Sequence, residues 1–490
     1  MHLRAAVKMR AFLGPTSLIT FQVIFMQVFT LAVFAIQAPL LGPQAFGSVA
    51  LGMVMVGFCE TVVTSVATDT LISLKDAGAA HYRTATTATL LASSLLGLAV
   101  FLGSDAAAWL ADDPSLAPVF RWMALLPPLS ALWVAPTAQT KREMQFKATV
   151  IRSVFSLALS GVIGVALAFS SMGVWALVAQ ALIYRASGAV ALWLLVPLRF
   201  QLGYTGMAGR ELAAIARTLF FARAMSWATG QIPRFLLGLS LGTVELGLYS
   251  LGARLTDVLI HLSVEPRTIV ARVELRRHAT DRQELDLAVR KLFATMSAVC
   301  FPMSIGGAVV IPTLFDAWLD PRWQTGASSV QLLLLCCVPY VTYYGCTALV
   351  LAMNQRRAEV IVATLQAVCL TLAVGLTARA GLDAASLSIL GTLALLLPVP
   401  LVLVRRCCGV EIGTIVGPQL PAFASAALMG IVVALAEARL RDSVSSVTLL
   451  VALIGFGALV YVAAMAILAP ALVRERLDGL RLRGNLGAAE

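Results

Sequence analysis

The chain has 490 residues, of which 59% are hydrophobic and only 12% are charged, and its mean hydropathy is +0.89. About one residue in four is charged in a soluble domain, so this composition excludes a soluble globular protein and predicts an all-α polytopic membrane protein. The net charge of +11 comes from basic residues that alternate with apolar runs, which argues against nucleic acid as a partner.

Apolar runs of about twenty residues recur along the chain, and each is long enough to cross a hydrocarbon core of about 30 Å as a helix. They predict about fourteen spans. The first starts after Arg4, Lys8 and Arg10 and ends near 36, and we expect it to be retained because no small-residue cleavage site follows. The others are expected near 46–73, 84–110, 116–138, 151–169, 173–197, 218–241, 246–271, 292–318, 327–353, 360–378, 385–404, 421–438 and 444–469.

The connections between these spans differ sharply in charge. With a cytoplasmic N-terminus, the inner segments hold 26 Lys and Arg residues and the outer segments hold 4. Basic residues are retained on the cytoplasmic side of a membrane. The sequence therefore predicts that both termini are cytoplasmic, and that anionic membrane lipids neutralise the inner surface.

Two connections share one pattern at an offset of 200 residues. The stretch 41–52 reads LGPQAFGSVALG and the stretch 241–252 reads LGTVELGLYSLG, with Leu and Gly in matching positions. Each follows one long apolar run and opens another, where glycine permits positive φ and close helix approach. This predicts two related halves plus a tail, the internal symmetry of secondary transporters.

The motifs of several enzyme classes are missing from the sequence. It contains no GxxxxGK[ST], GxSxG or HExxH, and the eight cysteines show no metal-ligand spacing. No predicted outer loop exceeds roughly twenty residues, whereas a membrane glycosyltransferase or polymerase would need an outer loop to hold its acceptor. We therefore expect no enzyme, no catalytic residue and no bound metal or cofactor.

Six arginines fall inside predicted spans, where an unpaired charge costs several kcal/mol and usually marks a substrate or ion path. Arg121 and Arg267 lie near span ends and can reach the interface. The other four are Arg185, Arg223, Arg234 and Arg254.

The span that follows the second repeat carries a polar stripe. Arg254, Asp257, His261 and Glu265 lie at i, i+3, i+7 and i+11, on one face of a continuous helix. Arg234 on the preceding span lies at a similar depth to Arg254, roughly 10–12 Å from the turn between them. The two are expected to bind one ligand; the alternative is internal pairing, such as Arg254 with Asp257.

The same preceding span presents Arg223 and Trp227 on the face of Arg234. An excess of inward-facing cations selects an anionic substrate, and arginine offers a planar fork that suits phosphate oxygens. Trp227 is a candidate for stacking on a sugar ring, with a simple helix contact as the alternative.

In the first half, Glu60 occupies nearly the same repeat position as His261. A carboxylate and a histidine at matching depth suggest a relay that couples transport to H⁺ or Na⁺, with Glu60, His261 and Asp257 as candidates. The alternative is a salt bridge between Glu60 and an arginine such as Arg185.

The sequence resembles the Wzx-type oligosaccharide flippases, including the ExoT-like exopolysaccharide branch, of the MOP superfamily, which also holds lipid II flippases and MATE drug exporters. The residues that carry the resemblance are LLGPQAFG at 40–47, QTKREMQFK at 139–147, GVWALV at 173–178, the repeat at 241–250, Pro302, and Trp318 with Trp323. The match covers nearly the whole chain. One departure is Ala38, where the family usually has a basic residue.

The resemblance implies two pseudo-symmetric six-helix lobes, at 1–205 and 206–406, and two further helices with a cytoplasmic tail at 407–490. It implies a flippase that carries a polyprenyl-pyrophosphate-linked oligosaccharide across the bacterial inner membrane for exopolysaccharide, O-antigen or capsule synthesis by alternating access, alongside polysaccharide polymerase or copolymerase machinery. Cavity cations would hold the pyrophosphate. The alternatives are a cation-coupled multidrug exporter of the same fold and, third, a membrane glycosyltransferase or polymerase.

Overall fold

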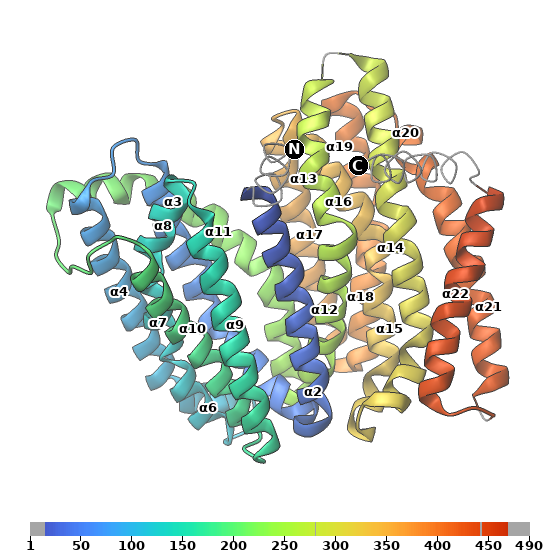
Figure 1. Cartoon of the computed structure of the whole chain (residues 1–490), viewed down its shortest axis with the longest axis horizontal. Helices are drawn as coiled ribbons and strands as arrows, with labels where there is room; N and C mark the ends of the chain where they lie inside the picture. Colours follow the sequence, from blue (N-terminus) through green and yellow to red (C-terminus); the bar gives the residue numbers. More distant parts are fainter. Residues whose placement is uncertain (1–14, 280, 442, 469–490) are drawn as a thin grey trace, which may run out of the picture. The chain divides into compact units, whose positions relative to one another are not determined.

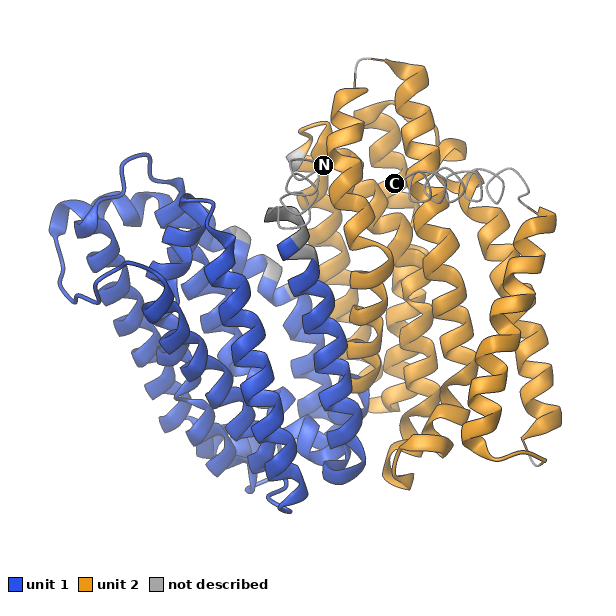
Figure 2. Ribbon diagram, in the orientation of Figure 1, with its two compact units in different colours: residues 1–250 blue, residues 251–490 orange. Residues whose placement is uncertain are grey.

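The computed structural model describes residues 15–279, 281–441 and 443–468, and these residues form helices and connections without any strand (Figure 1). Two compact units divide at residue 250, as Figure 2 shows. Each unit is built from apolar helices whose exposed faces carry large hydrophobic side chains, as expected for helices that face lipid. This confirms the predicted all-helical class.

Unit 1 begins with a long kinked helix and ends inside another. Its elements are α2 (Pro15–Phe58), η1 (Cys59–Thr64), α3 (Ser65–Ser73), α4 (Ala79–Leu102), α5 (Ser104–Leu110), α6 (Leu116–Met123), α7 (Leu126–Ala131), α8 (Val134–Arg142), α9 (Phe146–Phe169), α10 (Val174–Leu195), α11 (Gly206–Leu241) and the start of α12 (Thr243–Ser263). The helices α2, α9 and α10 pack side by side.

Unit 2 is organised around one long helix. Its further elements are α13 (Glu265–Arg277), α14 (Arg282–Trp318), η2 (Pro321–Gly326), α15 (Ala327–Leu335), α16 (Cys337–Ala352), α17 (Arg356–Thr377), η3 (Ala378–Ala380), α18 (Leu382–Leu395), α19 (Pro398–Cys408), α20 (Ile412–Val416), η4 (Gly417–Gln419), α21 (Leu420–Leu440) and α22 (Ser446–Leu468). Helix α14 packs against both α21 and α22.

The two repeat stretches have the same local geometry. Gly42 interrupts α2 with φ 72° and ψ 170°, and Gly242 separates α11 from α12 with φ 88° and ψ −177°. A Cβ on Gly47 would lie 1.6 Å from the carbonyl oxygen of Thr243, and a Cβ on Gly247 would lie 1.9 Å from that of Pro43. These reciprocal contacts join positions 200 residues apart, as a local twofold requires. Superposition of the entire halves stays a prediction.

Eleven segments of the described chain are long and apolar enough to cross a membrane. The longest, Phe21–Ser73, contains two predicted spans that meet at the Gly42 kink. The predicted spans at 218–241 and 246–271 form α11 and α12 but are too polar to be among the eleven. The total of about fourteen spans, and the division at 205 and 406, therefore stay predictions. Helix α11 lies in unit 1 because it packs against α2 and α3.

Three predicted spans are broken in the structure. The span at 84–110 divides between α4 and α5, and the span at 116–138 divides into α6, α7 and α8, where Pro127, Pro128 and Pro136 lack the N–H that a continuous helix needs. The span at 246–271 breaks at Val264, between α12 and α13, because Pro266 cannot donate to the carbonyl of Leu262. Arg267 donates to that carbonyl instead, at 3.4 Å.

Candidate functional site

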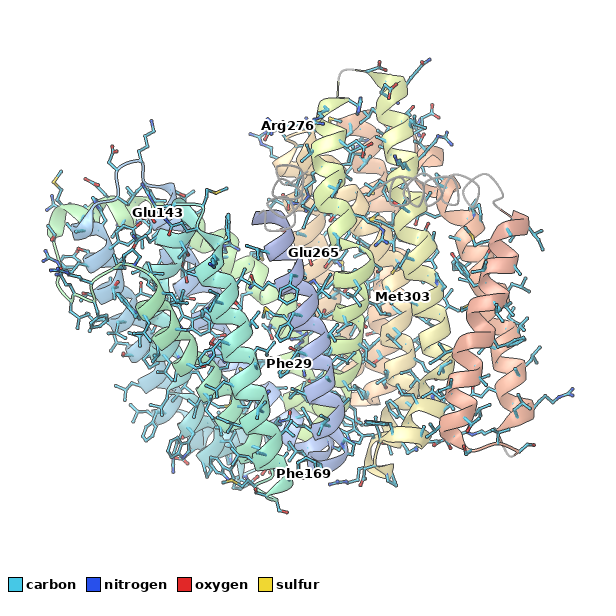
Figure 3. All side chains as sticks on the ribbon, viewed as in Figure 1. Phe29, Glu143, Phe169, Glu265, Arg276 and Met303 are labelled. Carbon is cyan, nitrogen blue, oxygen red and sulfur yellow. The ribbon has the colours of Figure 1, made fainter. Side chains whose placement is uncertain are left out.

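A polar cavity of about 370 Å³ lies inside unit 1, among η1, α3, α7, α8 and α11. Its wall carries two carboxylates, Glu60 and Asp69, and two cations, Lys141 and Arg223. Thr64, Thr68, Ser130, Trp133 and Thr137 complete most of the lining. Lys141 is two residues before Glu143, which Figure 3 labels at the end of unit 1 opposite Phe169. The cavity therefore extends inward from that end of the unit.

Glu60 forms an ion pair with Arg185. The Nε of Arg185 donates to Oε1 of Glu60, which also accepts a hydrogen bond of 2.7 Å from the Oγ of Ser130. The Arg185 residue is only 8% exposed and is held further by its Nη1 bond to the carbonyl of Ala181 at 3.3 Å, whereas the Glu60 side chain is 30% exposed. The salt bridge considered as the alternative for Glu60 is therefore present, and it lies within unit 1. Arg185 stands behind Glu60 and does not line the cavity.

A second ion pair joins Asp69 on α3 to Arg223 on α11. The Nε of Arg223 donates to Oδ2 of Asp69 at 3.1 Å, and the Nη2 reaches the same oxygen. The side chains are 27% and 45% exposed, so the pair keeps an open face to the cavity. Arg223 was a predicted site residue; Asp69 was not.

The reason that Asp69 escaped prediction is the π-helical segment η1, which contains Glu60. On a regular helix, residues nine apart lie roughly 180° around the axis from each other. A π-turn accommodates one extra residue, so Asp69 lies where an eighth residue would, roughly 80° from Glu60. Both carboxylates therefore face one cavity. Such π-segments are frequent at functional sites.

Trp133 connects the cavity to a further arginine that the sequence reasoning also missed. Its Nε1 donates to the carbonyl of Arg185 at 3.0 Å, and its ring lies 4.3 Å from the guanidinium carbon of Arg152. The edge of Tyr184 contacts the same ring, with 5.6 Å between ring centroids. Arg152 donates to Ser153 at 2.8 Å, and the described residues offer it no carboxylate. The QTKREMQFK segment and its basic neighbours were the available signal.

The charges around the cavity favour an anion. Lys141 is exposed on the wall and, within the described parts of the chain, forms no ion pair with a carboxylate. Counting Arg152 and Arg185 behind the wall, four cations surround two carboxylates. Cations that exceed their carboxylate partners attract phosphate groups, and at bilayer depth this attraction is screened little by water.

Trp227 lies outside the cavity wall. Its ring packs edge-on against Phe58 of α2, with 5.3 Å between centroids, and its buried Nε1 has no hydrogen-bond acceptor. A helix contact, the alternative to sugar stacking, is the role that its surroundings show. Arg234 is half-buried on the same helix, α11.

The polar stripe expected after the second repeat is divided between two helices. Arg254, Asp257 and His261 lie on α12, whereas Glu265 begins α13 beyond the break at Val264. The prediction of one continuous helix is wrong here, although the Nδ1 of His261 still pairs with Oε2 of Glu265. Asp257 is exposed and Arg254 is half-buried. Joint binding by Arg234 and Arg254 stays a prediction, as does the relay between Glu60 and His261.

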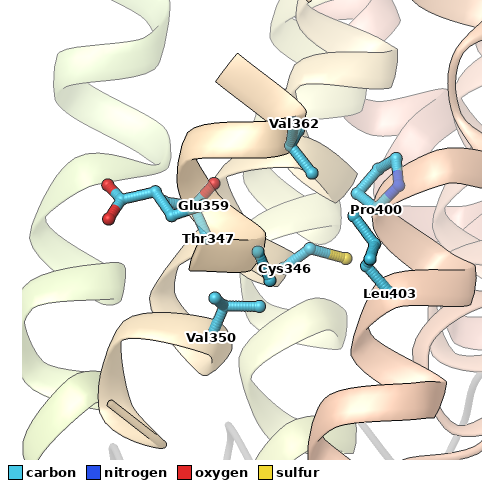
Figure 4. Close-up of a pocket in the computed structure, with 8 residues that line it drawn as sticks. Cys346, Thr347, Val350, Glu359, Val362, Pro400 and Leu403 are labelled. Carbon is cyan, nitrogen blue, oxygen red and sulfur yellow. The ribbon is translucent and has the colours of Figure 1, made fainter. Parts of the chain in front are cut away.

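A small crevice in unit 2 offers no second site (Figure 4). It lies between Cys346, Glu359 and Pro400 and has a volume of only about 10 Å³. This is about the space of one water molecule.

Comparisons with known proteins agree with this architecture. Residues 36–328 match the family described as polysaccharide biosynthesis protein. The succinoglycan biosynthesis transport protein ExoT of Rhizobium meliloti (strain 1021) is 27% identical over 229 residues, which are 46% of this chain and 45% of the relative. The match therefore spans less than half of either protein.

Two solved structures share the fold across most of their length. The lipid II flippase MurJ in an inward closed conformation has a TM-score of 0.72 at 12% identity, with 94% of this chain and 99% of that chain covered. An inward-facing multidrug resistance MATE family transporter of the MOP superfamily has a TM-score of 0.54 at 12% identity, with 84% and 95% covered. This multi-pass helical membrane protein has the fold of the MOP superfamily, and it belongs to the polysaccharide biosynthesis protein family.

Proposed function

We propose that this protein is a flippase that moves a polyprenyl-pyrophosphate-linked oligosaccharide across the bacterial inner membrane, with both termini cytoplasmic. The observation that carries the proposal is the cation-rich cavity in unit 1 of a protein whose family serves polysaccharide biosynthesis. A transport protein of succinoglycan biosynthesis is a relative, and a lipid II flippase shares the fold. The product would serve exopolysaccharide, O-antigen or capsule synthesis, together with a polymerase or copolymerase.

The cavity suits the head group of such a lipid. A pyrophosphate needs several donors at once, and Lys141 and Arg223 both present theirs to the same space. The threonine and serine hydroxyls of the wall can bond sugar hydroxyls, while the polyprenyl tail stays in lipid. The reaction transfers no group, so we propose a transporter and not an enzyme; alternating access of the cavity supplies the movement.

Coupling to an ion gradient is the second part of the proposal. Glu60 holds Arg185 by an ion pair and still faces the cavity. A proton on Glu60, or Na⁺ beside it, would weaken the attraction between the two side chains. Arg185 would then be available to the phosphates, which compete with Glu60 for the same guanidinium. No other cofactor is required by this scheme.

The test is polymer export by cells that carry single cavity variants. We expect Lys141→Gln to reduce export about tenfold or more, because a charge-assisted bond to phosphate contributes about 1.5–3 kcal/mol. Lys141→Arg should retain most export. Arg322→Gln is the matched control, since Arg322 forms an exposed ion pair with Asp320 away from the cavity. Expression of every variant is checked by immunoblotting.

The pair of Asp69 and Arg223 separates ligand binding from simple neutralisation. If Arg223 binds substrate, the double variant Asp69→Asn with Arg223→Gln should export as poorly as Arg223→Gln alone. Recovery of export in the double variant would show that Arg223 only neutralises Asp69. Normal export in both this double variant and Lys141→Gln would remove the cavity from the mechanism.

A cation-coupled multidrug exporter is the second candidate, and one observation favours it. The cavity wall carries as many carboxylates as cations, and cationic drugs would bind to Glu60 and Asp69. Drug accumulation in cells that lack the protein, compared with complemented cells, distinguishes the two. A flippase leaves drug accumulation unchanged and restores polymer export, whereas an exporter does the reverse.

A further inference from the structure

A second, larger hollow of about 580 Å³ lies on the surface of unit 1, away from the polar cavity. It is lined by Ser94, Leu98 and Phe101 of α4 and by Trp122, Leu125 and Pro128 of the broken span. Its volume is in the range of cavities that hold drug-sized ligands. We call it the α4–α6 groove.

The break between α6 and α7 creates this groove. Pro127 and Pro128 remove two backbone donors, so the chain leaves the helical path between Met123 and Leu126. On the facing helix, glycine at position 97 allows α4 to approach closely: a Cβ there would lie 2.5 Å from the carbonyl oxygen of Ala124. The small side chain of Ser94 leaves the space beside this contact open.

One end of the groove carries a pair of opposite charges. The Nη2 of Arg121, which lines the groove, donates to both carboxylate oxygens of Asp105 at 2.7 Å. The Nε donates to the Oγ of Ser104 at 3.2 Å. The Asp105 side chain is 70% exposed and the Arg121 side chain is 42% exposed. Both charges therefore remain open to a ligand.

Neither charge has exhausted its hydrogen-bonding capacity. The two N–H groups on Nη1 of Arg121 have no acceptor among the described residues, and a guanidinium has five donors in total. Each oxygen of Asp105 accepts one bond from Arg121 and can accept another. The pair therefore offers donors for one anion and acceptors for one cation, side by side.

The surroundings place this charge pair at the level of lipid head groups. Asp105 follows directly after α4, a candidate membrane span that ends at Leu102. The highly exposed Trp109 and Trp122 flank the pair, and tryptophans gather at the membrane interface. From Phe101 to Ser94 the groove then follows α4 for seven residues, about 10 Å, into the apolar part of the span.

We propose that the α4–α6 groove binds a zwitterionic phospholipid with a primary ammonium group, of the phosphatidylethanolamine class. The phosphate accepts bonds from Nη1 of Arg121, the ammonium donates to Asp105, and one acyl chain lies along Leu98 and Phe101. A phosphatidylglycerol has no cation for Asp105, and the trimethylammonium of phosphatidylcholine has no N–H to donate. This site is separate from the polar cavity and does not depend on the proposed transport activity.

The experiment is native mass spectrometry of the delipidated full-length protein, titrated with three lipids that share the same acyl chains. We expect the first phosphatidylethanolamine to bind about tenfold more tightly than phosphatidylglycerol or phosphatidylcholine, the difference of one charge-assisted hydrogen bond. Asp105→Asn should lower phosphatidylethanolamine binding to the level of phosphatidylcholine without weakening phosphatidylglycerol. Equal affinity of the three lipids for the unmodified protein would overturn the proposal.

A second variant tests the groove itself. Ser94 is exposed, so Ser94→Phe fills the groove without entering the core, and it should weaken the first binding event of all three lipids. Val162→Phe, on the exposed face of α9, is the matched control and should change nothing. If Asp105→Asn retains the phosphatidylethanolamine preference, or Ser94→Phe retains full binding, the groove is not the site.

Discussion

The reciprocal glycine contact between the two repeats makes a quantitative prediction about stability. Alanine at position 47 would place its Cβ 1.6 Å from the carbonyl oxygen of Thr243, and alanine at 247 would place its Cβ 1.9 Å from that of Pro43. An ordinary contact is about 3.4–4 Å. The opposing atoms belong to the backbone, so no side-chain rotation can relieve the overlap, and the two helix starts must separate by about 1.5–2 Å.

Such overpacking typically costs about 1–3 kcal/mol, which exceeds the gain of about 0.5–1 kcal/mol from replacing glycine in a helix. We therefore expect Gly47→Ala and Gly247→Ala each to lower the thermal unfolding temperature of the purified protein by a similar amount. The control is Gly391→Ala in α18, where a Cβ meets nothing within 4 Å, and this variant should be unchanged or more stable. Unfolding is followed by tryptophan fluorescence at one fixed scan rate, because only the ranking is compared.

Two results would refute this reasoning. If Gly47→Ala is as stable as Gly391→Ala, the close approach of the two repeats is absent in the protein. If only one of the two repeat variants is destabilised, the contact is not reciprocal and the local twofold fails.

Three further predictions concern charge. If Glu60 and His261 form a coupling relay, Glu60→Gln and His261→Ala should abolish the dependence of transport on the proton gradient in vesicles, and unchanged dependence would exclude the relay. If Arg254 binds phosphate, Arg254→Ala should reduce polymer export about tenfold to a hundredfold and the double variant with Asp257→Ala should be equally impaired, whereas rescue by the double variant would show internal pairing. Arg142 donates to three backbone carbonyls after α3, so Arg142→Gln should speed hydrogen exchange in the loop that follows, and unaltered exchange would contradict this role.

The sequence alone determined the class of the protein and much of its local organisation. Long apolar runs can be satisfied in lipid only as helices, so composition was sufficient to predict an all-helical membrane protein. The break at Gly42 and its counterpart at Gly242 were also readable, because glycine and proline act through local backbone geometry. The resemblance in the connecting segments led to the family that the comparisons show.

Only the tertiary structure decided which charges meet. Arg185 and Glu60 are 125 residues apart, and Arg223 and Asp69 are 154 apart, so helix packing and not periodicity selects these partners. A π-helical segment changes the phase of every residue beyond it, which no 100° periodicity can reveal. The α4–α6 groove likewise exists only because a proline break in one span lies against a glycine in another. Local chemistry sets where helices begin and end, whereas long-range packing sets what their side chains face.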